Sequence, residues 1–346
     1  MSRWAVVLAG GTGSRFWPLS TPAKPKQLLP LVTEKPLLHD SVSRLRPIVD
    51  AEHTVVLTNA GLTKAIRKLL PQLPRDNIIA EPQPAGTAAA LTWAALSIER
   101  RDGRNAVMIC VHADWAIADD ERFRETLLEA ERVALKTESL VTVGVVPTRA
   151  DPGFGYIQPA DPASGKPSGV KRFVEKPDRV HAEEMRNDGY LWNSGIFVWR
   201  VGDFLDEVDE HTPELAAALR HGRDGDASQF FASVIMPVSV DVGVLERSSK
   251  VMVVPGDFGW DDVGTWAALS RVRSKDEFGN VTTGDAHLLD CADNVVHADS
   301  GQVVMYGVND LVVVTKNGLT LVTTTDKASD LKRLIESLSA AELERS

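Results

Sequence analysis

Cysteine is scarce in this chain, with only Cys110 and Cys291 among 346 residues. The two are far apart and match no metal-ligand spacing, which argues against a disulfide framework or a cysteine-bound metal. We expect Cys110, which lies in an apolar run, to be a core residue. No apolar run approaches the roughly 20 residues of a membrane-spanning helix, and no cationic stretch leads into a long apolar segment near the N-terminus. We therefore expect a cytoplasmic protein with no membrane partner.

An excess of positive charge is also missing. The chain has 38 Lys and Arg against 48 Asp and Glu, a net charge of −10. This balance argues against a nucleic-acid partner held by a broad basic surface, although a nucleotide substrate needs only a few local cations. The hydrophobic content of 43% and charged content of 25% are ordinary for a globular protein. The length allows one large α/β domain and a smaller one.

Strand-like and helix-like segments alternate through the first 145 residues. Such alternation predicts an α/β fold: a Rossmann-like, three-layer domain with a mostly parallel mixed sheet. The expected strands are residues 4–8, 54–57, 106–111 and 140–145, and the expected helices are residues 37–45, 62–70, 87–99 and 122–135.

The pattern changes twice further along the chain. Glycine and proline become dense in 152–169, and short strands are expected at 170–174 and 196–199, so we interpret 147–250 as an insertion that closes over the ligand crevice. Short β-like runs then recur and predict a small β-rich, β-helix-like C-terminal unit, with an amphipathic helix at 327–343. The runs are 280–283, 286–289, 294–297, 303–306, 311–315 and 319–323. The expected domains are 1–272 and 273–346.

A glycine-rich loop follows the first expected strand. Glycines let the backbone approach an anion, and successive N–H groups in such a loop form an anion site. The loop is neither a Walker loop, which needs Gly-Lys-Ser/Thr, nor the dinucleotide fingerprint, because Phe16 stands where a third glycine would be. A solvated glycine turn is the simpler interpretation of Gly-Gly-x-Gly alone. Arg15, Pro25, Lys26 and the apolar run 28–31 together favour triphosphate binding. The candidate nucleotide-binding residues are Leu8, Ala9, Gly10, Gly11, Thr12, Gly13 and Ser14.

The segment from Leu8 to Leu31 resembles the signature of the sugar-1-phosphate nucleotidylyltransferases. Its form, Arg-Phe-Trp-Pro-Leu-Ser followed by Pro-Lys-Gln-Leu, is similar to the mannose-1-phosphate guanylyltransferase branch. The resemblance covers nearly the whole chain, to about Leu338. It implies that Arg15 stabilises the departing pyrophosphate and that Lys26 neutralises the α-phosphate region, so both are candidate catalytic residues. No general base is needed, because the attacking group is already a phosphate oxygen.

Two aspartates are candidate ligands for Mg²⁺, which prefers oxygen donors and often takes one or two protein carboxylates. Asp114 follows an expected strand, and Asp262 lies in Gly-Trp-Asp-Asp-Val-Gly-x-Trp. Taken alone, a helix cap and a turn would explain them equally well. The resemblance implies that Asp114 and Asp262 bind magnesium, with Asp261 orienting the loop.

Two further segments suggest a sugar pocket, because sugar hydroxyls call for carboxylate and amide partners. They resemble the family's Glu-Lys-Pro and Trp-Asn-Ser-Gly motifs. Glu175 and Asn193 are the expected hydroxyl partners, Lys176 the partner of the sugar phosphate, and Gly155 a backbone contact. In isolation these residues would be a surface ion pair and turn residues. The segment 240–246 resembles another family motif, and we give its Asp241 and Glu246 no firm role.

The expected base pocket departs from the family pattern. Glu81 and Pro82 match, but Ala85 and Gly86 stand where the family has Arg and Asn, followed by Thr87. Related thymidylyl- and uridylyltransferases use a glycine near this place, so the choice of base stays open. The metal segment also departs, reading His-Ala-Asp-Trp over 112–115 where the family has Pro-Ala-Asp-His.

Together these motifs predict an enzyme that joins GTP and mannose 1-phosphate into GDP-mannose and pyrophosphate. Another base or sugar, such as a manno-heptose, is one alternative. A catalytically silent subunit that senses a nucleotide sugar is another, but such a protein would have lost the cations or metal carboxylates. A molybdenum-cofactor guanylyltransferase would lack the two sugar motifs. The resemblance also implies a homodimer.

Overall fold

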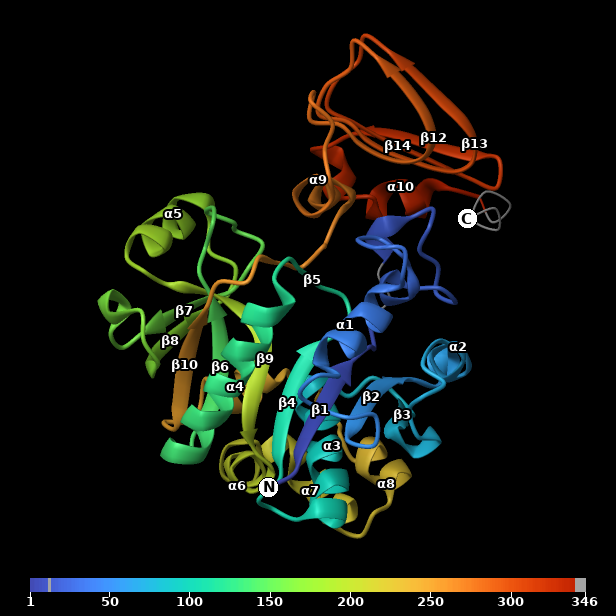
Figure 1. Cartoon of the computed structure of the whole chain (residues 1–346). Helices are drawn as coiled ribbons and strands as arrows, with labels where there is room; N and C mark the ends of the chain where they lie inside the picture. The colour runs from blue at the N-terminus through green and yellow to red at the C-terminus, as the bar shows by residue number, and fades with distance from the viewer. Residues whose placement is uncertain (12–13, 340–346) are drawn as a thin grey trace. The chain divides into compact units, whose positions relative to one another are not determined.

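The protein is described here by a computed structural model, which covers residues 1–11 and 14–339 (Figure 1). Its chain forms two compact units, each assembled from separate stretches of sequence. The first unit comprises residues 1–10, 42–112 and 119–258, and the second comprises residues 11–41, 113–118 and 259–346. The second unit therefore contains the C-terminal β-rich region together with residues 16–31, which we call the signature segment.

A nine-stranded mixed sheet is the centre of the first unit, in the order β3-β2-β1-β4-β9-β6-β10-β8-β7. Strands β1, β2, β3 and β4 pair in parallel, as do β6 and β10, whereas β9 is antiparallel to β4 and β6. The parallel strands place several carboxyl ends, where loops bind ligands, at one edge. The strands are β1 (Arg3–Leu8), β2 (Thr54–Asn59), β3 (Ile78–Glu81), β4 (Val107–His112), β6 (Leu140–Val145), β7 (Tyr156–Pro159), β8 (Ser168–Val174), β9 (Leu191–Arg200) and β10 (Val251–Gly256).

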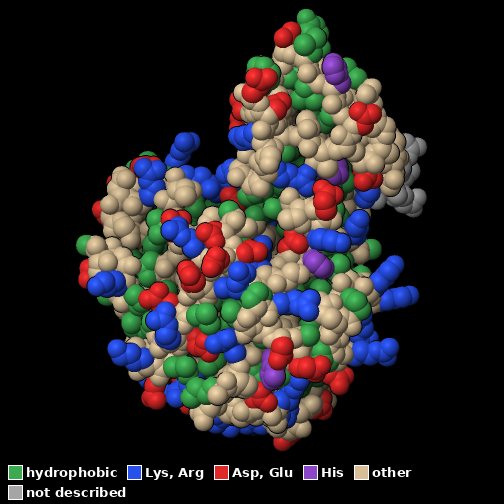
Figure 2. Space-filling model, in the orientation of Figure 1, with side chains coloured by type: hydrophobic (Ala, Val, Ile, Leu, Met, Phe, Trp, Pro, Cys, Tyr) green, Lys and Arg blue, Asp and Glu red, His purple; other side chains and the backbone are tan. Residues whose placement is uncertain are grey.

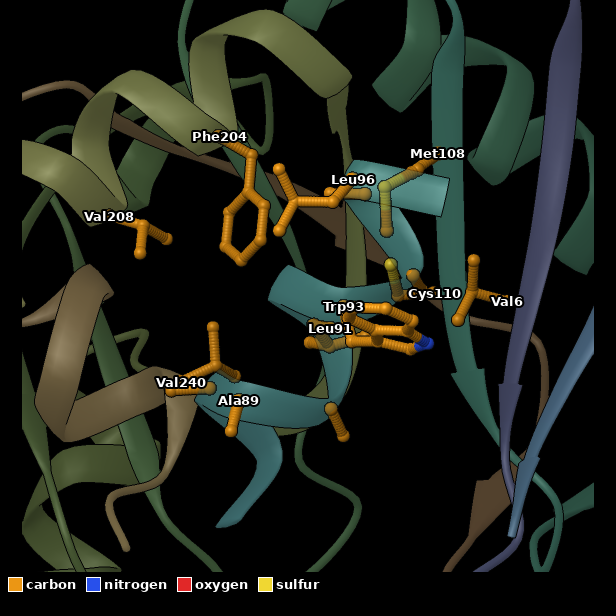
Figure 3. Close-up of a cluster of buried hydrophobic side chains, with 14 of the residues drawn as sticks. Val6, Ala89, Leu91, Trp93, Leu96, Met108, Cys110, Phe204, Val208 and Val240 are labelled. Atoms are coloured by element: carbon orange, nitrogen blue, oxygen red, sulfur yellow. The ribbon is translucent and has the colours of Figure 1, made fainter. Parts of the chain in front are cut away.

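Helices cover both faces of this sheet (Figure 1). Helix α4 packs on β6, β9 and β10, while α3 packs on β1, β2 and α6. The small alanine side chains of α3 allow close packing, and Trp93, Leu96 and Phe204 fill a core that includes Val6 and the expected core residue Cys110 (Figure 3). The helices are α1 (Leu37–Leu45), α2 (Thr63–Leu69), α3 (Gly86–Asp102), α4 (Asp120–Thr137), α5 (Arg179–Asn187), α6 (Val201–His211), α7 (Ala216–Arg223) and α8 (Ala227–Ala232).

The second unit contains a β-helix-like sheet in the order β12-β13-β14-β15. The first three strands pair in parallel, and β15 is antiparallel to β14. Asn294 is buried and donates to Asn280 Oδ1 at 2.9 Å and to the Val308 carbonyl at 3.0 Å, which links successive turns of the chain. Its elements are β5 (Ala116–Ile117), β11 (Trp260–Asp261), α9 (Leu269–Val272), β12 (Val281–Leu289), β13 (Val295–Tyr306), β14 (Leu311–Lys316), β15 (Leu319–Thr324) and α10 (Lys332–Ser337).

The signature segment shares one hydrophobic core with the C-terminal β strands. Phe16 and Trp17 are buried in it, and the Phe16 ring lies 5.2 Å from the Trp266 ring, measured between centroids. Val295 and Val312, from β13 and β14, belong to the same cluster. The β-rich region thus supplies part of the packing that the signature segment needs.

The predicted helix over 327–343 is wrong. A 3₁₀ turn covers Lys327–Ser329, the helical conformation ends at Asp330, and α10 spans only Lys332–Ser337. Ala328 and Leu331 are buried in the core of the second unit, so tertiary packing overrides the helical pattern. Residues 340–343 lie outside the described part of the chain. The paired short runs within 280–289 and 294–306 are instead two longer strands, β12 and β13.

Within residues 1–11 and 14–339, every helix is too short or too polar to cross a membrane. Acidic and basic side chains alternate over the face of the molecule drawn in Figure 2. That face carries no broad basic area.

Candidate active site

The expected catalytic lysine and the two expected metal ligands meet in the second unit. Lys26 Nζ lies 3.0 Å from Asp114 Oδ2 and donates to the backbone carbonyls of Asp262 and Val263 at 2.9 and 3.1 Å. Its side chain is about nine-tenths buried, with 10% of its surface exposed. Because the charge is withdrawn from water and bonded to oxygen atoms, it is held in one place. Residues 236 positions apart in sequence are therefore brought together here.

The two aspartates have the chemistry of a magnesium site. Burial raises the pKa of Asp262, and the negative charges of Asp261 and Asp114 raise it too, while Lys26 and a hydrogen bond from the Gly264 N–H lower it. Carboxylates that repel one another in a buried place favour a cation. Two protein carboxylates also suit Mg²⁺, whose other ligands are commonly water and substrate phosphates. Asp114 and Asp262 therefore fit the ion that the sequence implies.

An ion pair orients the loop that carries Asp262. Asp261 is buried and accepts hydrogen bonds from Arg271 Nε at 2.7 Å, Arg271 Nη2 at 2.9 Å and the Val263 N–H at 3.0 Å. Val263 is buried with φ of 46°, a left-handed conformation that β-branched residues rarely adopt. Such strain persists only where surrounding contacts enforce it, and it concentrates at functional sites. Asp261 thus holds the loop as the sequence led us to expect, while Arg271 was not foreseen.

The glycine loop begins where β1 ends. The Ala9 N–H donates to the Leu57 carbonyl at 2.8 Å, so the backbone of Leu8 and Ala9 is largely engaged in the sheet. Gln27 is buried, and its Nε2 donates to the Gly11 carbonyl at 2.9 Å, which gives this residue of the signature segment an anchoring role that sequence reasoning missed. Ser14 opens a 3₁₀ turn, Ser14–Phe16. The candidates Thr12 and Gly13 lie outside the described residues.

Arg15 is exposed in the second unit. It borders a shallow groove whose other lining residues come from the end of the chain: Ser329, Asp330, Leu331, Lys332 and Ile335. The structure thus places Arg15 beside the C-terminal segment, whereas Lys26 lies with the two aspartates.

The residues expected to form the base pocket lie in the first unit. Burial raises the pKa of Glu81, at the end of β3, to about 7. Gly86 has φ of +83°, and a Cβ there would stand 2.4 Å from the Val238 carbonyl oxygen. Only glycine fits such a position, so the positive φ and the nearby carbonyl explain why glycine stands where the family has Asn. Thr87 Oγ1 accepts from the Val240 N–H at 2.9 Å. Pro82 follows Glu81 in the turn before α3.

The residues expected to bind the sugar also gather in the first unit. A Cβ on Gly155 would lie 3.1 Å from Glu175 Oε2, and the Asn193 N–H donates to the Gly155 carbonyl at 2.8 Å. Glu175 Oε1 lies 2.8 Å from Lys176 Nζ, and both side chains are exposed. Asn193 Nδ2 donates to Asp241 Oδ1 at 2.7 Å. Glu175, Lys176, Asn193 and Gly155 are therefore neighbours, and Asp241 joins them.

A single π-helical turn, Asp241–Leu245, carries Asp241, and Glu246 follows it as the C-cap. The Glu246 N–H donates to the Asp241 carbonyl at 2.8 Å, and such turns are frequent at functional sites. Burial raises the pKa of Glu246, and the charges of Asp241 and Glu175 add to the effect. We call the residues expected to bind the sugar, Gly155, Glu175, Lys176 and Asn193, the sugar cluster. The motif around 240–246, to which the sequence alone gave no firm role, lies beside this cluster.

An arginine contacts the loop that contains Gly153 and Gly155. The Arg149 guanidinium lies over the rings of Phe154 and Trp192, 5.4 and 5.0 Å from their centroids, and pairs with Asp151 at 2.8 Å. Cation–π contacts of this kind contribute about 1 kcal/mol or more when partly desolvated. No sequence signal marked Arg149.

Among the described residues, one group of three metal-capable side chains lies close together, namely Glu207, Glu210 and His211 on α6. Lys250 Nζ lies 2.8 Å from Glu207 Oε1, and His211 Nε2 lies 3.2 Å from Glu207 Oε2, so two side chains of this group already have ionic neighbours. Asp114 and Asp262 remain the better magnesium candidates because substrate phosphates would complete their coordination.

Comparisons with known proteins show which family the chain resembles. The family model for nucleotidyl transferase matches residues 4–278, and that for the MannoseP isomerase/GMP-like beta-helix domain matches residues 284–338. The chain is 35% identical to the mannose-1-phosphate guanylyltransferase of Escherichia coli strain K12, over 97% of this chain and 73% of that one. It is 34% identical to the alginate biosynthesis protein AlgA of Pseudomonas aeruginosa, over 97% of this chain and 72% of that one.

A solved structure from Thermus thermophilus, named mannose-1-phosphate geranyltransferase, aligns with a TM-score of 0.90 at 33% identity. It covers 97% of this chain, and this chain covers 99% of it. The resemblance found in the motifs is confirmed, as are the α/β nucleotidyltransferase fold and the β-helix-like C-terminal region. The chain belongs to the mannose-1-phosphate guanylyltransferase family of nucleotidyl transferases.

Proposed function

We propose that this enzyme transfers GMP from GTP to mannose 1-phosphate, forming GDP-mannose and pyrophosphate. The observation that carries the proposal is the contact of Lys26 with Asp114 and with the backbone of Asp262. A cation and two carboxylates are the groups that phosphate transfer requires, because the reaction depends on alignment and charge neutralisation. The family's guanylyltransferase names support the choice of GTP and mannose 1-phosphate.

Each residue has a defined task in this proposal. Asp114 and Asp262 would hold Mg²⁺, which would supply positive charge to the triphosphate. Lys26 exchanges its carbonyl and carboxylate contacts for the α-phosphate, and Arg15 neutralises the leaving pyrophosphate. The N–H groups of Gly11 to Ser14 join Arg15 in stabilising the pyrophosphate.

The remaining recognition groups are the residues expected to bind the base and the sugar. Glu81, Pro82, Gly86 and Thr87 border the base. Glu175, Asn193 and Gly155 contact the sugar, with Lys176 at its phosphate. The sugar phosphate oxygen attacks the α-phosphorus in line, and the bond from that phosphorus to the pyrophosphate oxygen breaks.

A pyrophosphate-release assay tests the reaction. We expect the wild type to turn over GTP with mannose 1-phosphate faster than other nucleoside triphosphates, hexose 1-phosphates or heptose 1-phosphates. Asp262→Asn and Lys26→Met should each lower kcat by about 10²- to 10³-fold, the usual loss for an electrostatic group. Asp257→Asn, at an exposed aspartate nearby in sequence, is the matched control. Faster turnover of another nucleoside triphosphate or sugar 1-phosphate would mean that the enzyme has a different substrate pair within the same family. Tight GDP-mannose binding without turnover would indicate a sensing protein.

We also propose three properties that follow from the family resemblance and the substrates. The domains are 1–272 and 273–346, the enzyme acts in the cytoplasm, where GTP is made, and it forms a homodimer. Light scattering coupled to size-exclusion chromatography measures the last of these directly, and a monomer mass at assay concentrations would contradict it.

A further inference from the structure

Side chains from the C-terminal part of the second unit bind five backbone carbonyls of the signature segment. All five acceptors are main-chain oxygens, so the contacts fix the path of the backbone rather than any particular side chain. The bonds run from Trp266 to Trp17 at 3.1 Å, from Lys316 to Pro18 and Leu19 at 3.2 and 3.4 Å, and from Arg273 to Pro30 and Leu31 at 2.9 and 2.5 Å.

Lys316 is the least expected of these donors. It is the last residue of β14, and its ammonium is partly withdrawn from water. Burial and the nearby charge of Lys24 lower its pKa, which Asp299 partly offsets. Desolvation and repulsion by a second cation both destabilise the charged form of Lys316, so this placement does not by itself stabilise the protein. Its charge-assisted bonds to the two carbonyls offset that cost.

The turn that Lys316 contacts is tied directly to the catalytic residues. The N–H groups of Leu19 and Ser20 donate to the Phe16 carbonyl at 2.9 and 3.0 Å. Phe16 follows Arg15 in the same 3₁₀ turn. A shift of the carbonyls at residues 18 and 19 would therefore move the backbone that carries Arg15.

A second observation links the same two regions. Arg15 borders a groove whose other walls are Leu331, Ile335 and their neighbours in the C-terminal segment. The C-terminal region thus meets the signature segment at its backbone and also reaches the expected catalytic arginine next to it.

We propose that Lys316 is a positioning residue for nucleotide binding: it holds the Pro18–Leu19 turn so that Arg15 keeps one fixed position toward the triphosphate. The β-helix-like region then contributes to nucleotide binding through Lys316. This inference rests on the proposed function for its kinetic consequence, but its structural consequence can be measured without any substrate.

The test compares three variants. Lys316→Met removes the charge and keeps the length, Lys316→Arg restores a donor, and Lys327→Met removes an exposed lysine from the same unit as a control. Hydrogen–deuterium exchange of the peptide covering residues 16–24 is measured without ligand. We expect at least about fivefold faster exchange in Lys316→Met, at least partial recovery in Lys316→Arg, and no change in Lys327→Met.

Steady-state kinetics supply the second readout. In Lys316→Met the KM for GTP should rise about tenfold, while the KM for mannose 1-phosphate stays within twofold, because the sugar cluster lies on other residues. A purely structural role would lower kcat through a smaller active fraction and leave both KM values unchanged, which would overturn the proposal. Unchanged exchange at residues 16–24 would overturn it as well. If the wild type released no pyrophosphate with any substrate pair, the proposed function would fail, and exchange together with binding of a fluorescent GTP analogue would still decide the role of Lys316.

Discussion

Replacing Asp261 by Asn tests how the loop of Asp262 is held. The substitution keeps the size of the side chain and an oxygen that can accept from the Val263 N–H, but it removes the negative charge facing Arg271. The wild-type carboxylate is only 5% exposed and accepts two bonds from the guanidinium, at 2.7 and 2.9 Å. Breaking a buried charge pair costs about 3–5 kcal/mol. Since 37% of the Arg271 side chain reaches solvent, water offsets part of that loss, and we expect about 2 kcal/mol.

The same variant should lower catalysis without removing any group that touches substrate. Val263 is held at a positive φ by its N–H bond to Asp261 and by Lys26 at its carbonyl, so a weakened Asp261 lets the Asp262 carboxylate shift. We expect a kcat decrease of about tenfold to a hundredfold, because displacements near 1 Å can cost about two orders of magnitude. Urea unfolding and pyrophosphate release are measured beside Asp257→Asn. An Asp261→Asn enzyme with wild-type stability and kcat would refute this account of the loop.

Three further predictions concern the first unit. Burial raises the pKa of Glu81 from 4.5 to about 7, so the protonated side chain stabilises the folded state below pH 4.5, and this stabilisation is lost as the pH rises through 7. Between pH 5 and pH 7.5 the urea midpoint should therefore fall more in the wild type than in Glu81→Gln. An equal fall in the two proteins would contradict this. Gly86→Asn, which restores the family's residue, should destabilise the protein by about 2 kcal/mol or more, because its Cβ would meet the Val238 carbonyl at 2.4 Å; an unchanged unfolding midpoint would show that the backbone adapts. Asp241→Leu should raise the KM for mannose 1-phosphate about tenfold, because it frees the Asn193 amide, and a matching rise in the KM for GTP would argue for a general loss of structure instead.

Much of the α/β fold could be predicted from local pattern. The strand at 140–145 and the helix at 37–45 have the expected bounds, because an apolar run between polar turns and a clear amphipathic period both depend on nearby residues. Strand β10 was not anticipated, since it ends in Pro-Gly, which is typical of a loop. The mixed sheet depends on β9, whose antiparallel pairing with β4 and β6 no local pattern encodes.

The candidate site was likewise predictable only in part. Motif positions pointed to Lys26, Asp114 and Asp262, and the structure brings those three together. The supporting residues Arg271 and Arg149 were missed, because an arginine that holds a loop and one that is only solvated look alike in a sequence. The role of Gly86 also needed coordinates, since its Val238 neighbour is remote in sequence and only their close approach shows why a side chain is not tolerated.

The interleaved make-up of the second unit has a consequence for synthesis on the ribosome. Its core needs Phe16 and Trp17, made early, together with Trp266, Val295 and Val312, made near the end. While the chain is growing, those two early aromatic rings lack Trp266 and the two valines, so the signature segment is among the last parts of the protein to reach its final packing. A chain that stops short of Trp266 would lack those partners, so its signature segment could not complete this core.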